Sequence, residues 1–252
     1  IGTESKQGVP MSITEVADLT ASEEAVKRCL SELANSLHER GVLLAEADRW
    51  EESFESTAEA VQLRRRLVRE HTEDFGSQLA RSLHNLGAIF RHWGRRHKAL
   101  EAIEEAVQIR RRLAQQRAAE FLPGLATSLL ELGDHLKEMP RPKEGLEAIE
   151  EAVQIHRGLA QQRPEEFLPE LARSLVQLDE HLKGMWRREE GLQAIEEAVQ
   201  IHRRLAQERP ERFLRELASS LLKWSFGLGA LHRREEELLV TAEADQLLVQ
   251  IH

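Results

Sequence analysis

The sequence repeats itself every 46 residues. The frame Leu-Ala-x-Ser-Leu recurs five times, at residues 33–37, 79–83, 125–129, 171–175 and 217–221. Tandem copies of one unit usually stack so that each copy contacts only its neighbours, and the stack presents an extended surface. The repeat therefore favours a binding protein over an enzyme, and it predicts one elongated domain.

Each copy contains two apolar stripes with helical spacing. Apolar residues three and four positions apart fall on one face of an α-helix. In the second copy the stripes are Leu79, Leu83, Leu86 and Phe90, then Leu100, Ile103 and Val107. The chain is also rich in helix-forming Ala, Leu, Glu and Arg and contains only 4% aromatic residues. The sequence thus predicts an all-α protein built from helix-turn-helix units.

Large and small residues also stand at fixed places within each copy. In the second copy they are Leu83, Leu86, Gly87, Phe90, Ala99, Ile103 and Ala106. This spacing resembles the tetratricopeptide repeat, a helix-turn-helix of about 34 residues. The fourth copy departs from it at Asp179, where glycine is expected. The resemblance implies a right-handed superhelical solenoid of five repeats.

The repeat here is longer than the family's usual one by about twelve residues. We expect them at the end of each second helix and the start of the next first helix, as in kinesin-light-chain-type repeats. Pro164 and Pro210 suit the first turn of such helices. Residues 1–19 are predicted to be a flexible segment or a cloning remnant, followed by a single solenoid over 20–252. The predicted repeat cores are 34–67, 80–113, 126–159, 172–205 and 218–251.

Composition limits the class of partner and the location. The formal net charge of -9 argues against general binding to polyanions. Cys29 is the only cysteine, so an internal disulfide is excluded, and its register matches Phe75 and Phe121, which predicts a core position. No apolar run approaches the roughly 20 residues that span a bilayer, and no secretion signal is evident. We therefore predict a cytoplasmic protein that binds no membrane.

Nothing in the sequence indicates an active site. Several of the eleven histidines, such as His156 and His202, share one register of the repeat, and so do the five frame serines. His92 and His97 lie in a basic turn, but no cysteine or carboxylate beside them has zinc-site spacing. We therefore predict that the chain is not an enzyme and holds no metal and no cofactor.

The family resemblance implies a ligand groove lined by the first helix of each repeat. The copies differ strongly at the positions that face such a groove. Mixed Arg, Lys, amide and carboxylate side chains suit a peptide, because amides bind its backbone and charges select its side chains. The candidate ligand-binding residues are Arg81, Asn85, Arg91, Glu131, Lys137, Arg173, Gln177, Lys183 and Lys223. We predict a protein-interaction scaffold or adaptor that binds a peptide or protein segment.

Two other functions remain open at this point. The chain resembles the regulatory or sensor arm of a larger signalling protein whose effector domain lies elsewhere. The turns at 91–98, 141–143, 187–188 and 233–234 would form a basic edge for nucleic acid, with Trp93 and Trp186 among them, but glutamates follow directly and make this less favoured. Trp224 and Phe226 in the last copy either cover the core or promote end-to-end self-association.

Overall fold

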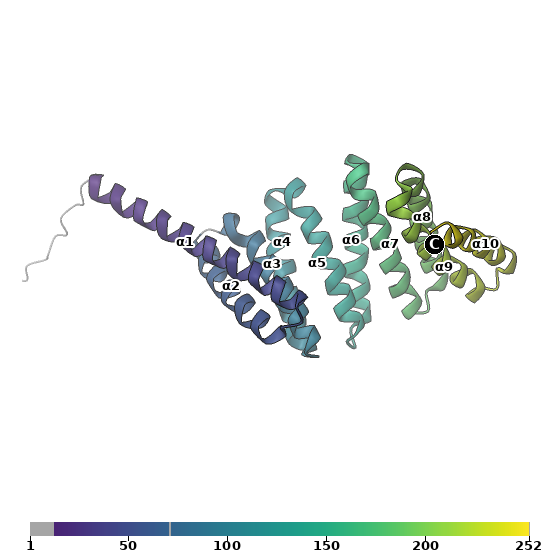
Figure 1. Ribbon diagram of the computed structural model, residues 1–252, viewed down its shortest axis with the longest axis horizontal. Coiled ribbons are helices and arrows are strands. Elements are labelled where there is room, and N and C mark those ends of the chain that lie inside the picture. Colours follow the sequence, from purple (N-terminus) through teal and green to yellow (C-terminus); the bar gives the residue numbers. More distant parts are fainter. Residues whose placement is uncertain (1–12, 71, 252) are drawn as a thin grey trace, which may run out of the picture. The chain divides into compact units, whose positions relative to one another are not determined.

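The computed structural model describes residues 13–70 and 72–251, which form ten α-helices and no strand. The helices are α1 (Ile13–Glu46), α2 (Trp50–Glu70), α3 (Thr72–His92), α4 (Arg96–Gln116), α5 (Ala118–Lys137), α6 (Pro142–Gln162), α7 (Pro164–Gly184), α8 (Arg188–Glu208), α9 (Pro210–Ala230) and α10 (Arg234–Ile251). Successive pairs match the five copies of the repeat (Figure 1). The predicted all-α solenoid of five helix-turn-helix repeats is confirmed.

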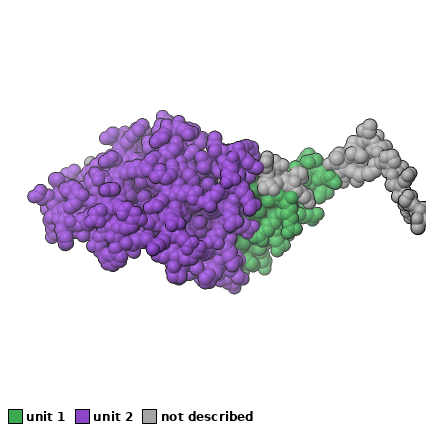
Figure 2. Space-filling view, turned by 180° about the vertical axis from the view of Figure 1, so that it is seen from behind, with its two compact units in different colours: residues 1–89 green, residues 90–252 purple. Residues whose placement is uncertain are grey.

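The chain divides into two compact units. Unit 1 is residues 1–89 and unit 2 is residues 90–252 (Figure 2). In unit 1, α1 packs on α2, and in unit 2 each helix from α4 to α10 packs on the next. Because α1 begins at Ile13, it extends into the segment 1–19 that was predicted to precede the fold, while residues 1–12 lie outside the described residues.

Single residues separate the lengthened helices of unit 2. Arg163 is the one non-helical residue between α6 and α7, with φ −136° and ψ 72°. Arg117 and Arg209 have similar backbone angles and separate α4 from α5 and α8 from α9. Pro164 and Pro210 occupy the first turn of the helices that follow, where their missing N–H groups have no helical partner to lose. The extra residues of the repeat therefore extend the helices, as predicted.

The core of unit 2 is continuous across the repeats. The nearly identical segments of the second helices place Ile149 and Ile195 at 0% exposure. Cys29 is exposed, so its predicted core position is wrong. In later repeats a preceding second helix packs on the first helix, and among the described residues no such helix comes before α1.

The turn inside each repeat uses a left-handed residue in four of the five copies. These residues share one register and have φ between 59° and 66°: Asp48, Gly94, Trp186 and His232. Pro140 holds this register in the third copy, and its ring fixes φ near −65°. The third turn is therefore built differently, with the N–H of Arg141 donating to the carbonyl of Met139 at 2.7 Å.

The two helices of the third repeat cross closely at glycine. A Cβ atom on Gly133 of α5 would lie 2.5 Å from Ile149 Cδ1 and 3.0 Å from the carbonyl oxygen of Gly145. By contrast, a Cβ atom on Gly158 of α6 would meet nothing within 4 Å. The two glycines thus differ in what an added methyl group would encounter.

Alanine at these two glycines should change stability in opposite directions. Gly133→Ala should lower the free energy of unfolding by about 1–3 kcal/mol, because α5 and α6 have to separate. Gly158→Ala should raise it by about 0.5–1 kcal/mol, because alanine loses less backbone entropy in a helix. Urea unfolding followed by circular dichroism measures both, and a stabilising Gly133→Ala would show that the crossing is not tight.

Candidate functional site

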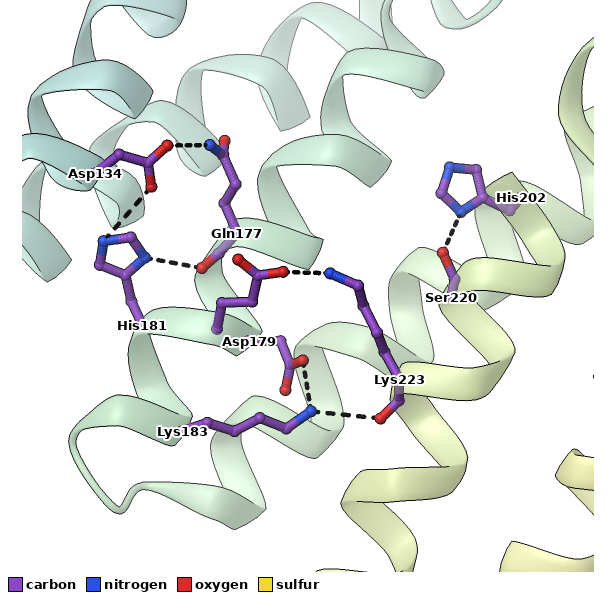
Figure 3. A network of polar contacts seen from close by, with 9 residues as sticks. Asp134, Gln177, Asp179, His181, Lys183, His202, Ser220 and Lys223 are labelled. Carbon is purple, nitrogen blue, oxygen red and sulfur yellow. Dashed lines mark hydrogen bonds and ion pairs between the residues drawn. The ribbon is translucent and has the colours of Figure 1, made fainter. Parts of the chain in front are cut away.

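The first helices of the last three repeats, α5, α7 and α9, carry a polar network (Figure 3). Between α5 and α7, Gln177 Nε2 donates to Asp134 Oδ2 at 2.8 Å. His181 Nδ1 donates to the carbonyl oxygen of Gln177 at 3.0 Å, and its Nε2 lies 3.9 Å from Asp134 Oδ1. We call the surface that these helices share the first-helix face.

The network continues from α7 to α9. Lys223 Nζ forms an ion pair with Glu180. Lys183 Nζ donates to Asp179 Oδ2 at 2.7 Å and to the carbonyl oxygen of Lys223 at 3.4 Å (Figure 3). Side chains predicted to contact a ligand therefore connect neighbouring repeats to each other.

Asp179, the departure from the family pattern, is a fully buried carboxylate. Burial raises the pKa of its carboxyl group, while the hydrogen bond and charge of Lys183 oppose that shift. Gly191 makes room for it, since a Cβ atom there would lie 2.9 Å from Asp179 Oδ1. Burial likewise raises the pKa of Asp134. The substitution of glycine by Asp179 is thus accommodated by a cation and a glycine nearby.

The junctions between repeats contain buried polar pairs that the sequence analysis missed. A side chain of each second helix from α2 to α8 bonds the frame serine 18 residues later, in the pairs Arg64–Ser82, Arg110–Ser128, His156–Ser174 and His202–Ser220. His156 Nδ1 lies 2.6 Å from Ser174 Oγ, which donates to the carbonyl oxygen of Glu170 at 2.7 Å. Burial lowers the pKa of His156 to about 4. These histidines and serines hold the repeats together.

Arginine takes the place of histidine in the two earlier junctions and reaches more acceptors. Arg64 also donates to the carbonyl oxygen of Gln78 at 2.9 Å and to Asn35 Oδ1 at 2.8 Å. Arg110 donates to the carbonyl oxygen of Gly124 at 2.7 Å. The constant separation from the serine was visible in the sequence, so a comparison of the copies at this register could have found the pairs.

A pocket of about 510 Å³ lies between α7 and α9. Arg173 and Lys223, both predicted to bind ligand, line it from different helices. Its other walls include Val176, Phe213 and Arg215. Arg215 was not among the predicted residues, although it stands where the two preceding copies have proline. This pocket thus brings two predicted residues from different repeats together.

The other predicted residues of unit 2 lie apart from this pocket. Gln177 and Lys183 belong to the network along the first-helix face. Lys137 is exposed at the end of α5, and Glu131 is half-buried one turn and a half before it. Arg91 is exposed in the last turn of α3. Among the predicted site residues of unit 2, the exposed ones that a ligand can reach are Arg91, Lys137 and Arg173.

Arg81 and Asn85 belong to unit 1. Arg81 Nη2 lies 3.5 Å from His38 Nε2, and burial together with the charges of Arg64 and Arg81 lowers the pKa of His38 to about 4. Asn85 lines a small pocket of about 150 Å³ with Gly41. Asn85 is the one predicted site residue among those that line this pocket.

Trp224 and Phe226 have different environments. Trp224 is partly buried and packs against the core, whereas Phe226 is 73% exposed. Lys183 Nζ lies 5.9 Å from the centroid of the Phe226 ring, within the range of a cation–π contact. Trp224 therefore covers the core, and Phe226 adds an apolar side chain to the first-helix face.

Residues 13–70 and 72–251 contain no group of three or more His, Cys, Asp or Glu side chains arranged to hold a metal ion. Among the same residues, no helix is long and apolar enough to cross a membrane.

Comparison of the sequence with known families agrees with this geometry. The tetratricopeptide-repeat model matches residues 32–112, and the same frame and helix pairs continue from there to Ile251. The chain contains tetratricopeptide repeats (TPRs). The predicted family is thus confirmed. The family model of anaphase-promoting complex subunit 5 also matches this TPR protein, over residues 112–182 and 171–224. The comparison with curated proteins gives no match.

Solved structures of other repeat proteins share the TPR fold. A putative kinesin light chain from Podosopora anserina, with nearly identical TPR-like repeats, gives a TM-score of 0.66 at 18% identity, covering 88% of this chain and 96% of that chain. BtubC (BKLC) from P. vanneervenii gives 0.60 at 17% identity, covering 89% and 92%. YrrB, described as a TPR protein with an unusual peptide-binding site, gives 0.52 at 14% identity, covering 91% of each chain. These likenesses establish the fold.

Proposed function

We propose that this TPR protein is a non-catalytic scaffold that binds a peptide or protein segment on the first-helix face. The TPR fold supports protein-interaction scaffolds in general, because stacked repeats present an extended surface. The described peptide-binding site of YrrB shows that a similar fold accommodates a peptide.

The pocket between α7 and α9 carries the proposal. Arg173 is exposed and has no partner among the described residues, so its guanidinium group is available to a ligand carboxylate or carbonyl. Val176 and Phe213 supply apolar wall beside it. The pocket therefore offers both a charged anchor and a site for an apolar side chain, which is the combination of apolar wall and few polar groups typical of ligand pockets.

The polar network prepares the face for binding. Gln177 and Lys223 are already fixed by Asp134 and Glu180 on the neighbouring helices. Side chains that are fixed before binding lose less entropy when a ligand arrives. The network thus favours a face that binds without rearrangement.

Reversing the charge of Arg173 should remove the partner. We expect Arg173→Glu to lower the recovery of the partner from native lysate by roughly tenfold, because the anchor of the pocket becomes repulsive. Mass spectrometry of the captured proteins gives the measurement, and binding of the purified partner confirms it. The matched control is Arg112→Glu, an exposed arginine of α4 away from the first-helix face. Identical captures by the wild type and both variants would refute this site.

The remaining predictions concern matters beyond this face. The regulatory-arm alternative depends on chain outside these 252 residues and stays a prediction. The absence of catalysis, the cytoplasmic location and end-to-end self-association also stay predictions.

A further inference from the structure

The turn of the second repeat lacks an arginine–glutamate pair that the other four turns share. In the other four turns an arginine pairs with the glutamate three residues later: Arg49–Glu52, Arg141–Glu144, Arg187–Glu190 and Arg233–Glu236. The hydrogen bond from Arg141 lowers the pKa of Glu144 below its usual value, as expected for a charged pair. In the second repeat the arginine is Arg95, but Lys98 stands at the register of the glutamate.

Arg95 therefore has no carboxylate partner among the described residues. Its guanidinium group lies 5.0 Å from the centroid of the Trp93 ring, and Lys98 Nζ lies 5.7 Å from that of Phe90. Residues 91–98 contain four Arg or Lys and no acid, whereas the equivalent segment of every other copy contains at least two acids. We call residues 91–98 the basic turn.

A cavity of about 660 Å³ opens beside the basic turn. One side consists of residues 94–98 with Leu100, and the other of residues 138–141. Met139 and Pro140 give the far side an apolar surface, and Pro140 is the residue that changes the course of the third turn. One carboxylate, Glu138, lines the cavity, and Arg96 Nε lies 3.7 Å from it.

We propose that the basic turn and its cavity bind an acidic segment of a partner protein. Carboxylates of the segment meet Arg95 and Lys98, and an apolar side chain of the segment enters the cavity against Leu100 and Met139. Charge complementarity supports this occupant, because residues 91–98 carry four cations and no acid, and Glu138 is the one carboxylate that lines the cavity. The surface lies on the turns rather than on the first-helix face, so this proposal does not depend on the peptide-binding pocket between α7 and α9.

A protein segment fits this surface better than a nucleic-acid strand. A strand needs a cationic track over several repeats, but Arg141, Arg187 and Arg233 are each occupied by a glutamate of their own turn. The net charge of -9 also opposes a long polyanion. Only the turn at 91–98 combines four Arg or Lys with no acid of its own, which matches a short acidic segment.

Fluorescence anisotropy of the full chain tests the proposal. The probe is a labelled peptide of alternating glutamate and leucine, compared with the same peptide containing glutamine in place of glutamate and with a labelled oligothymidylate. The test variant is Lys98→Glu, which introduces the residue that the other four turns carry and gives Arg95 an internal partner. The control is Arg112→Glu, the same change of net charge on α4. Circular dichroism establishes that both variants remain folded.

We expect the glutamate peptide to bind, and Lys98→Glu to weaken it roughly tenfold while Arg112→Glu changes little. Four results would overturn the proposal: binding weaker than about 1 mM, equal binding of the glutamine peptide, equal effects of the two variants, or preference for the oligothymidylate. Arg173→Glu should affect the glutamate peptide no more than Arg112→Glu does. Loss of the peptide with Arg173→Glu instead would place binding on the first-helix face.

Discussion

Replacing Leu192 by alanine should lower the free energy of unfolding by about 2–5 kcal/mol. The same substitution at Leu238, one repeat later, should change it by less than about 0.5 kcal/mol. The two leucines occupy the same register, but Leu192 is 4% exposed and Leu238 is 66% exposed. Their difference tests directly whether each repeat is stabilised by the repeat that follows it.

The next first helix accounts for the difference. α9 packs on α8, and Gly227 comes so close that a Cβ atom there would lie 3.0 Å from Leu192 Cδ1. Among the described residues no helix follows α10, so Leu238 has no such cover. Removing the Leu192 side chain leaves a cavity in the core. Water fills the space left by the exposed Leu238 side chain, so no cavity forms there.

Urea unfolding at several protein concentrations measures both variants. Because Leu238 and Leu239 are both exposed on α10, end-to-end association would bury them and make the effect of Leu238→Ala depend on concentration. A similar loss in both variants at every concentration would contradict the exposed position of Leu238. A loss for Leu238→Ala only at high concentration would support the self-association predicted from the sequence.

The helices could be predicted from the sequence because their determinants are local. The apolar stripes, the prolines at positions 164 and 210 and the 46-residue period each act within one or two helices, and the five copies reinforce one another. The start of α1 was less predictable. The helix begins at Ile13, inside the segment 1–19 that was expected to precede the solenoid.

The candidate site was less predictable because its residues meet across repeats. Gln177 and Asp134 are 43 residues apart, and nothing local to either shows that they bond. Variation among the copies marked Gln177 and Lys223 as surface residues, but it could not distinguish a ligand contact from a contact between repeats. Register revealed Asp179, and the same alignment of the five turns would have revealed Lys98.

Replacing His156 by glutamine should reduce the acid sensitivity of the fold. Burial lowers the pKa of this imidazole to about 4, and the charge of Arg173 acts in the same direction. The unfolded chain has an ordinary histidine pKa of about 6.5, so between pH 6.5 and 4 it takes up a proton that the folded chain does not. The free energy of unfolding therefore has its full value above pH 6.5 as far as His156 is concerned, and it falls as the pH drops below 6.5. The loss attributable to His156 between pH 7.5 and 5 is about 2 kcal/mol.

The comparison of wild type and His156→Gln at both pH values isolates this effect. Glutamine cannot titrate but can donate to Ser174 Oγ, so the wild type should lose about 2 kcal/mol more than the variant on acidification. Asp134 and Asp179 act in the opposite direction, because their raised pKa values favour protonation of the folded chain, but they are common to both proteins. His202→Gln should behave in the same sense, since burial also lowers the pKa of His202. A difference between wild type and His156→Gln that is the same at pH 7.5 and 5 would mean that the junction between α6 and α7 opens enough to admit the proton.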